Sequence, residues 1–299
     1  MNRKIPPGII SILVILILIG VFAFRFHSIP NTPVNVENKN VAKLIISMDF
    51  GREELLEKNV TPGQSVIDAL KSLVNVSTAY GGKFVVAINN ISSNPITQED
   101  WFYYVNGILS NVGAQDYIIN PGDIIRWDYH SWKDLTVNSE LMDFPAMFVH
   151  GHDSRTYSLI VAYEMEYEKN AEELYHFFKK MKVNVSMIAI EELKESKLKN
   201  CNAVLIGNSA KIIRDLNGRY LRLGWKYYFK DGVVYDRKNH RYRGAFAQIT
   251  QSPYNPKGVW ACENLLLLIS GNEEYIPKVI NALINHEIES FWLLEGETI

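Results

Sequence analysis

The sequence predicts a membrane-anchored chain with two further domains, an α+β domain and then an α/β domain with a mostly parallel sheet. Three observations lead to this fold class. An uncharged apolar run lies close to the N-terminus, strand-like alternation dominates residues 41–133, and buried strands alternate with helices in residues 155–299. Alternation of strands and helices is the pattern of a parallel sheet with helical crossovers.

The composition is that of a globular protein without a strong electrostatic field. The chain has 299 residues, 47% hydrophobic and 21% charged, with a formal net charge of −2. A nearly neutral chain attracts polyanions weakly, so we expect no nucleic-acid partner. Two cysteines are too few for a disulfide scaffold. No Cys-x-x-Cys or Cys/His cluster accompanies them, so we expect no metal site.

The first predicted element is a single transmembrane helix. No charge interrupts the twenty residues from Ile5 to Phe24, and a helix of that length spans about 30 Å, the thickness of a bilayer core. Arg3 and Lys4 precede the run and favour a cytoplasmic N-terminus. GVFAFRFHS offers no good cleavage site, which favours an uncleaved signal anchor over a cleaved signal peptide. We therefore expect a single-pass cell-membrane protein whose bulk is extracytoplasmic.

The α+β domain is predicted to follow the anchor (residues 1–25) and a linker (residues 26–40) rich in Pro, Asn and Ser. VAKLIISMDF alternates like a strand, and SVIDALKSLVNV has the apolar spacing of a helix with Ser65 as its N-cap. GKFVVAINNI predicts a strand. WFYYVNGILS predicts a strand that ends in a hairpin turn at Asn106-Gly107, and a Pro-Gly turn precedes the last strand, DIIRWDYHSW.

The α/β domain is predicted for residues 155–299, after a connector at residues 134–154. YSLIVAY, NAVLIGN and ENLLLLISGN have the apolar content of buried strands, and VNVSMIAI predicts a further strand. NAEELYHFFKKMK, SAKIIRDLN and EEYIPKVINALINHE have the spacing of helices. KYYFKDGVVYDRKNHRYRGAFAQI interrupts the alternation and predicts an inserted hairpin. SFWLLEG is a candidate edge strand.

The aromatic stretch at residues 101–132 contains three Trp and five Tyr or Phe. Alternation along a strand places Trp101, Tyr103 and Val105 on one face, opposite Phe102 and Tyr104. In the last strand, Ile125, Trp127 and Tyr129 share a face, opposite Arg126, Asp128 and His130. The apolar sets form the core of a small β domain, or part of them lines a shallow site for a planar ligand or a sugar.

Three motifs in this domain occur in the order of a known family. The segments that contain them are TPGQSVIDAL, WFYYVNG and INPGDIIRWDY. The positions that match the family pattern are Gly63, Ser65, Val66, Asp68, Ala69, Leu70, Trp101, Tyr103, Val105, Asn106, Gly107, Gly122, Asp123, Ile125, Trp127 and Tyr129. Residues 41–133 thus resemble the transcobalamin-like C-terminal domain family, which is also a module of microbial surface proteins. The resemblance covers about a third of the chain.

The resemblance implies a β-grasp-like sheet packed on one helix, and a domain that lies over one face of a corrinoid such as cobalamin. In the cobalamin carriers a helical-barrel domain holds the other face, and this sequence has no such barrel. Residues 155–299 resemble the α/β modules of surface-layer and cell-envelope proteins more loosely, through AVLIGNSA and LLLLISGN. No residue is carried over from that second likeness.

Other polar groups have both structural and functional interpretations. His150 and His152 form a His-x-His pair that could chelate a metal, but solvated surface is the more common role of such a pair. The Gly-Asn-Ser turn at residues 207–209 could hold an anion, or Ser209 could simply cap a helix. Cys201 and Cys262 could form a disulfide or remain buried free thiols.

Two further charge patterns have the same ambiguity. The basic run at residues 236–244, DRKNHRYRG, fits either an acidic polymer or lipid surface, or a solvated hairpin edge. Carboxylate pairs such as Glu164 and Glu166 carry no information without geometry.

The function expected from the sequence is binding at the cell surface. The expected ligand is a corrinoid-like or other small planar molecule, and the candidate ligand-binding residues are Trp101, Tyr103, Tyr104, Trp127, Tyr129 and Trp132. An alternative is an envelope interaction protein that contacts proteins or glycans without a small ligand. A third is a hydrolase that uses the α/β domain. No catalytic motif is present, so we do not expect an enzyme, and we expect no cofactor.

Overall fold

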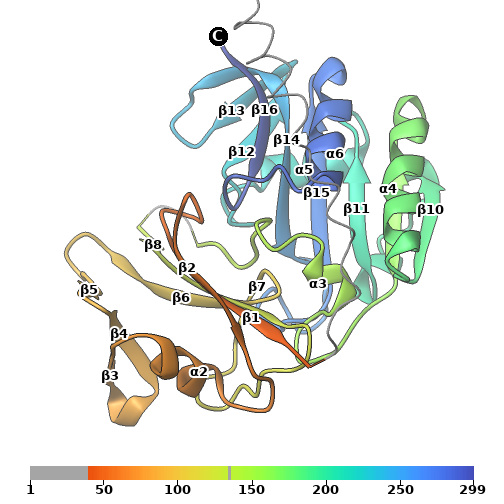
Figure 1. Ribbon diagram of the computed structural model, residues 1–299. Coiled ribbons are helices and arrows are strands. Elements are labelled where there is room, and N and C mark those ends of the chain that lie inside the picture. Colours follow the sequence, from red (N-terminus) through yellow and green to blue (C-terminus); the bar gives the residue numbers. More distant parts are fainter. Residues whose placement is uncertain (1–39, 134–135) are drawn as a thin grey trace, which may run out of the picture. The chain divides into compact units, whose positions relative to one another are not determined.

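The computed structural model describes residues 40–133 and 136–299. The predicted anchor at residues 1–25 and all but the last residue of the predicted linker lie outside the described residues. Among the helices that are described, none is long and apolar enough to cross a membrane. The fold is of the mixed α+β type, rich in sheet and with few helices (Figure 1).

The first sheet has the strand order β2-β1-β8-β6-β7. Its strands are β1 (Ala42–Met48), β2 (Glu53–Val60), β6 (Glu99–Val105), β7 (Ile108–Leu109) and β8 (Ile124–Ser131). The first and last strands, β1 and β8, are parallel neighbours in the middle of the sheet. The other strand pairs are antiparallel. The Asn106-Gly107 turn predicted from the sequence joins β6 to β7 at positive φ, as such hairpin turns require.

One helix packs on this sheet. Helix α2 (Val66–Leu73) begins after Ser65, whose hydroxyl accepts a hydrogen bond from the backbone N–H of Asp68, so the predicted N-cap is confirmed. The buried face of α2 joins a core cluster with the apolar faces of β1, β6 and β8. A small antiparallel sheet follows it, made of β3 (Val76–Ala79), β4 (Phe84–Ile88) and β5 (Ile91–Ser92), with a 3-10 turn η1 (Tyr80–Gly82).

The second sheet has eight strands in the order β10-β9-β11-β15-β14-β13-β12, with β16 paired to β14. The strands are β9 (Leu159–Tyr163), β10 (Val185–Ala189), β11 (Asn202–Ile206), β12 (Tyr227–Lys230), β13 (Val233–Asp236), β14 (Arg241–Gln251), β15 (Leu265–Gly271) and β16 (Leu293–Thr298). Only β10, β9, β11 and β15 are parallel. The expectation of a mostly parallel sheet was therefore wrong, because the long strand β14 pairs antiparallel with β13, β15 and β16.

Helices cover both faces of the second sheet. Helices α4 (Glu168–Lys180) and α6 (Ile276–Ile284) share one core cluster with the sheet, and α5 (Lys211–Gly218) belongs to the cluster on the other face. Figure 1 shows α4 and α6 side by side over the parallel strands. The shorter elements include α3 (Ala146–Val149), η3 (Ile190–Glu192) and η4 (Lys197–Lys199). The polar segment at residues 191–200 thus forms 3-10 turns.

The predicted connector at residues 134–154 is largely buried where it is described. The side chain of Asn138 accepts hydrogen bonds from the Thr250 hydroxyl and from the backbone N–H of Gln251 in β14. The backbone N–H of Leu141 donates to the carbonyl of Phe291. The described residues all belong to one compact unit, so the boundary that we predicted between two domains stays a prediction.

Candidate functional site

The aromatic residues predicted to bind a ligand lie mainly in the core. Trp101, Tyr103, Trp127 and Tyr129 belong to the cluster beneath α2, as the alternation along the strands predicted. Tyr104 points to the opposite face and is 0% exposed. Only Trp132 presents its ring to solvent, with 41% of its surface exposed. In this conformation a ligand could therefore reach one of the six predicted residues.

The polar atoms of three of these buried aromatic side chains form hydrogen bonds within the protein. The indole N–H of Trp101 donates to the carbonyl of Ile91 at 3.0 Å, and the Tyr129 hydroxyl donates to the carbonyl of Ser92 at 2.9 Å. The Tyr103 hydroxyl donates to Ser110 Oγ at 2.8 Å. Burial raises the pKa of Tyr103 above its usual value, so the phenol stays neutral. These contacts tie the small sheet and the β7 turn to the first sheet.

The opposite face of β8 holds a buried polar network that the sequence did not predict. Arg126 donates to Asp143 Oδ1 from Nε at 3.1 Å and from Nη2 at 2.6 Å. Asp128 accepts from the Ser47 hydroxyl at 2.7 Å and from the backbone N–H of Gly51 at 2.9 Å, and His130 Nδ1 lies 2.7 Å from its other oxygen. Arg126 and Asp143 thus form a buried ion pair, and hydrogen bonds stabilise the buried carboxylate of Asp128.

The His-x-His pair does not form a solvated surface. His152 is 1% exposed, its Nε2 lies 3.1 Å from Ser110 Oγ, and burial lowers its pKa to about 4, so the ring is neutral. The expectation of a solvated pair was wrong for His152. Within residues 40–133 and 136–299, no three His, Cys, Asp or Glu side chains are grouped to hold a metal. Cys201 and Cys262 are buried free thiols, and burial raises the pKa of each to about 11.

Polar groups do converge where the parallel strands of the second sheet end. Glu164, directly after β9, is 2% exposed and accepts hydrogen bonds from three consecutive backbone N–H groups that follow β11. These are the N–H groups of Asn208, Ser209 and Ala210, at 3.0, 2.6 and 2.5 Å. The N-cap of α5 is Ala210, so the predicted cap by Ser209 was wrong. The carboxylate of Glu164 takes the place that an external anion would occupy at this turn.

Asn208 connects the ends of three strands. Its amide oxygen accepts from the Ser270 hydroxyl at 2.8 Å and from the backbone N–H of Gly271 at 2.9 Å. Its amide nitrogen donates to the Gly271 carbonyl at 2.7 Å and to the Tyr167 hydroxyl at 3.3 Å. The Tyr167 hydroxyl thus accepts a hydrogen bond from Asn208. Its own O–H group remains able to donate a hydrogen bond to another group.

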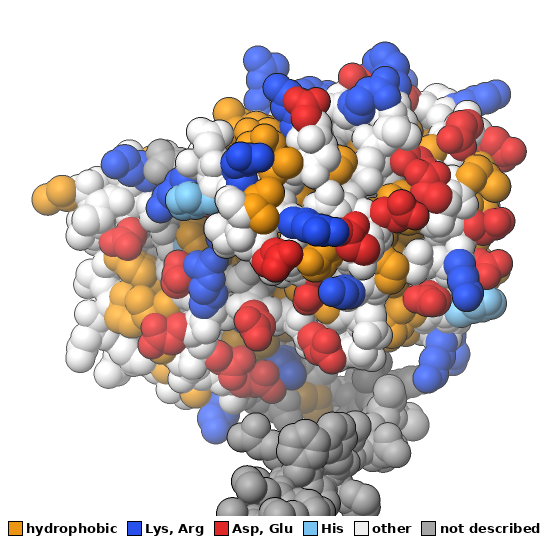
Figure 2. Space-filling view, turned by 90° about the horizontal axis from the view of Figure 1, so that it is seen from above, with side chains coloured by type: hydrophobic (Ala, Val, Ile, Leu, Met, Phe, Trp, Pro, Cys, Tyr) orange, Lys and Arg blue, Asp and Glu red, His pale blue; other side chains and the backbone are white. Residues whose placement is uncertain are grey.

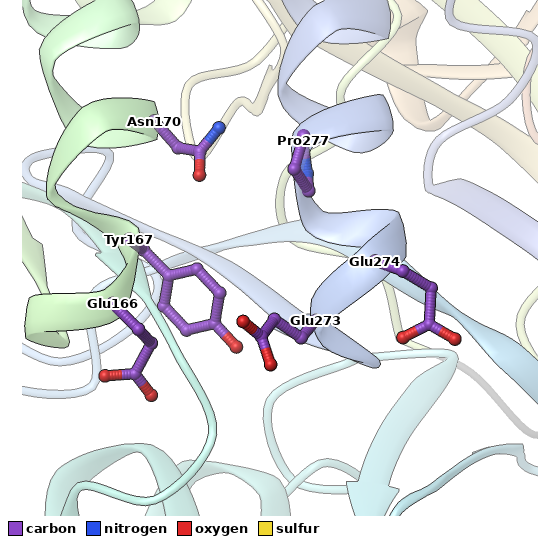
Figure 3. A pocket seen from close by; sticks show the side chains of 6 residues that line it. All are labelled: Glu166, Tyr167, Asn170, Glu273, Glu274 and Pro277. Carbon is purple, nitrogen blue, oxygen red and sulfur yellow. The ribbon is translucent and has the colours of Figure 1, made fainter.

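A pocket of about 310 Å³ opens beside Tyr167, between the first turns of α4 and α6 (Figure 3). One wall comes from η2 (Met165–Tyr167) and α4, and the other from η5 (Glu273–Tyr275) and α6. The residues that line it are Glu166, Tyr167, Asn170, Glu273, Glu274 and Pro277. Figure 3 shows the ring of Tyr167 reaching across toward Glu273, with the Glu166 carboxylate beside it and Glu274 farther along η5.

The pocket carries uncompensated negative charge. Arg243 pairs with Glu274 through Nη2 at 2.7 Å. Across the described residues, no ion pair joins Glu166 or Glu273 to a cation. Burial, and then the charges of Glu166 and Glu273, raise the pKa of Tyr167 above its usual value. Tyr167 is therefore a neutral hydroxyl donor between two carboxylates.

Acidic residues also follow the other strands at this edge of the sheet. Glu191 and Glu192 lie in η3 after β10, as Glu166 follows β9 and Glu273 follows β15. Figure 2 looks onto this edge and shows Asp and Glu side chains along the right side, where α4 and β10 lie, as well as elsewhere on this face. The sequence contained a signal, since EMEYE, IEE and NEE each come directly after a strand. Glutamates in first turns also stabilise helices, so the pattern alone does not indicate a site.

Comparisons with known proteins find a likeness for part of the chain. Residues 63–131 match a family model described as "Domain of unknown function (DUF4430)". No curated protein matches the chain. A solved structure from Ruminococcus gnavus ATCC 29149, described as "a putative metal binding protein", is 13% identical. The alignment covers 30% of this chain and 95% of that one, with a TM-score of 0.26, a likeness too low to support any argument about this chain.

Proposed function

We propose that this protein is a membrane-anchored, extracytoplasmic binding protein that holds a small organic cation in the pocket between α4 and α6. The observation that carries the proposal is the pair of unneutralised carboxylates, Glu166 and Glu273, on either side of the Tyr167 hydroxyl. A ligand ammonium group between the two carboxylates would neutralise one negative charge and be attracted by both. Charge-assisted hydrogen bonds of that kind are stronger than neutral ones.

The position of the pocket in the fold supports a binding role. Strands β10 and β11 lie on opposite sides of β9, and the helices after β9 and β11 lie on opposite faces of the sheet. Strand order therefore reverses at β9. In open α/β sheets, ligands bind outside the carboxyl ends of the strands near such a reversal. The pocket between the helices that follow β9 and β15 lies at that edge.

The size and chemistry of the pocket limit the ligand. A volume of about 310 Å³ is at the small end of ligand sites, which run from about 300 to 1,000 Å³. The ring of Tyr167 offers a surface for cation–π contact, and the amide of Asn170 offers both a donor and an acceptor. A primary or quaternary ammonium compound with a few carbon atoms has these properties.

Two finer expectations from the sequence belong to the same proposal. We infer that residues 41–133 form a β-grasp-like unit related to the transcobalamin-like module, supported by the family match at residues 63–131 and by the parallel central pair of β1 and β8. We also infer an anchor at residues 5–24, on the sequence alone. The first unit would then hold the α/β pocket away from the membrane.

Calorimetric titration of the full chain in detergent tests the proposal. The probes are putrescine and choline, with acetate as an anionic control. We expect saturable binding of at least one cation and none of acetate. Glu166→Gln and Glu273→Gln should each weaken binding by about tenfold, because each removes one charged acceptor. Glu287→Gln removes an exposed charge elsewhere and should change nothing.

Two outcomes would count against the proposal. One is a failure of both cations to bind up to millimolar concentration. The other is binding that survives the double variant Glu166→Gln/Glu273→Gln with its affinity intact. The exposed positions of both residues should leave the unfolding transition unchanged, so either result can be interpreted.

A hydrolase at the same place is the second candidate. Two carboxylates that line one pocket are the groups that glycoside hydrolysis uses. Incubation of the full chain with nitrophenyl glycosides separates the two functions. Release of nitrophenol that disappears in Glu166→Gln would favour the hydrolase, and the binding proposal predicts no release.

A further inference from the structure

A second surface lies on the hairpin of β12 and β13 and the start of β14. Tyr228 of β12 is paired with Tyr235 of β13, and Tyr235 is paired with Arg241 of β14. Directly opposed residues share a face of the sheet, and so do residues two apart on one strand. Lys230 therefore joins Tyr228, Tyr235 and Arg241 on one face.

The tyrosines on this face form a stacked row with a third tyrosine. The ring of Tyr220 stacks on Tyr228 at 4.3 Å between centroids, and Tyr228 stacks on Tyr235 at 5.2 Å. All three side chains are half-buried. Because Tyr228 is covered on both ring faces, the row meets solvent through ring edges and hydroxyls. The Tyr228 hydroxyl lies 3.4 Å from Asn239 Oδ1, beside the exposed Lys238.

Positive charge is concentrated in this part of the chain. Residues 211–243 contain ten Lys or Arg and three Asp or Glu, although the whole chain carries a net charge of −2. Lys211 and Arg243 are neutralised by Asp215 and Glu274. For Lys230, Lys238 and Arg241, all exposed, the described part of the chain supplies no ion pair. Two of these cations, Lys230 and Arg241, thus share the face of the tyrosines, and Lys238 lies in the turn next to Asn239.

We propose that this face, named here the tyrosine row (Tyr220, Tyr228 and Tyr235 with Lys230, Lys238 and Arg241), binds an acidic polysaccharide. The cations match its carboxylates, and a guanidinium such as Arg241 can pair with a carboxylate through two hydrogen bonds. The hydroxyl edges of the tyrosines match the hydroxyls of the sugar rings. Single-stranded nucleic acid fits less well, because bases bind by stacking on free ring faces, and those of Tyr228 are covered.

This inference concerns a surface other than the cation pocket and extends the role of the protein to attachment within an envelope. Exposed Lys and Arg on a hairpin also prevent edge-to-edge aggregation, but that role does not require a stacked row of tyrosines beside them. The charge pattern and the row together favour a ligand.

Affinity electrophoresis of the full chain in detergent through polygalacturonate gels tests the inference at low salt. We expect retardation by polygalacturonate and none by the fully methyl-esterified polymer, which has the same sugar backbone without its charges. Lys230→Gln/Arg241→Gln should weaken retardation by about tenfold, since two exposed charges are lost. Lys58→Gln/Lys71→Gln removes two exposed charges from the first part of the chain and is the matched control.

Each alternative result overturns the inference. These results are no retardation of the unaltered chain, equal retardation by the esterified polymer, or equal effects of the two double variants. Binding of poly(dT) as strong as that of polygalacturonate, lost in Lys230→Gln/Arg241→Gln, would identify a general polyanion surface instead. The thermal transition of both double variants should match that of the unaltered chain, which keeps a negative result interpretable.

Discussion

The carboxylate of Glu164 organises the carboxyl edge of the second sheet. It accepts three backbone hydrogen bonds and lies so close to Gly207 that a Cβ there would meet the Glu164 side chain at 2.4 Å. Gly207 also has φ of +144°, a conformation that residues with side chains rarely adopt. Glycine is required at this position, and the turn depends on one buried acid.

Glu164→Ala should destabilise the fold by about 3 kcal/mol, because it leaves three partly buried backbone N–H groups without their acceptor. Glu164→Gln keeps one acceptor oxygen and should cost less. Glu166→Gln, two residues away and exposed, should stay within about 0.5 kcal/mol of the unaltered chain. Urea unfolding of the three variants measures the difference. Equal stability of Glu164→Ala and Glu166→Gln would show that the carboxylate contacts are unimportant.

His152 should make stability depend on pH. Its pKa in the folded protein is lowered to about 4 by burial, below the value of about 6.5 for an unfolded chain. Its contribution is therefore fully present above pH 6.5 and is lost as the pH falls toward 4, with a total on the order of 3 kcal/mol. Urea unfolding at several pH values should show a steeper loss for the unaltered chain than for His152→Gln. His176→Gln is the matched control, and the same slope in all three would contradict the prediction.

Trp132 is the ring that remains for a planar ligand among those predicted from the sequence. One exposed ring offers little contact area, so we expect no saturable binding of cobalamin to the full chain. Titration followed through the visible corrin bands measures it. Micromolar binding that Trp132→Ala weakens in a folded protein would contradict this expectation. It would support the hypothesis that the aromatic stretch binds a corrinoid.

Strand β8 illustrates why part of the fold could be predicted and part could not. Alternation assigned Ile125, Trp127 and Tyr129 to the core beneath α2, and the structure agrees. The opposite face carries Arg126 and Asp128, which a sequence pattern would leave in solvent. Their burial depends on Asp143 and Ser47, partners distant in the sequence. Long-range pairing of charges leaves no local periodicity from which to predict it.

The site was missed for a related reason. The aromatic stretch is conspicuous in the sequence but supplies core, whereas the pocket is built from turns that follow β9 and β15, about 100 residues apart. The strand alternation correctly predicted parallel neighbours with adjacent carboxyl ends. The choice among many glutamates required the positions of α4 and α6, which the sequence does not give.

The ion pair between Arg126 of β8 and Asp143 can be tested for its contribution to stability. Arg126→Met should destabilise the protein by about 3–5 kcal/mol, because Asp143 is left buried without its partner. Arg126→Met/Asp143→Leu removes both charges and should recover much of the loss. Denaturant unfolding of the two variants and of Asp143→Leu completes a double-mutant cycle. If the loss of unfolding free energy in the double variant equals the sum of the losses in the two single variants, the charges do not act as a pair.

Across the whole molecule, opposite charges are segregated although the net charge is small. Glutamates gather where the parallel strands end, and basic residues gather in residues 211–243, from α5 to the start of β14. Arg243 and Glu274 join the two regions through their ion pair. A small cation in the pocket and an acidic polymer on the tyrosine row are compatible, since each surface attracts what the other repels.

The most direct test of the cation pocket is a crystal structure of the chain grown with putrescine. The ligand should lie between α4 and α6, with one nitrogen within hydrogen-bonding distance of the Glu166 and Glu273 carboxylates and close to the Tyr167 hydroxyl. An unoccupied pocket at saturating putrescine, or putrescine bound only at another surface, would contradict the account.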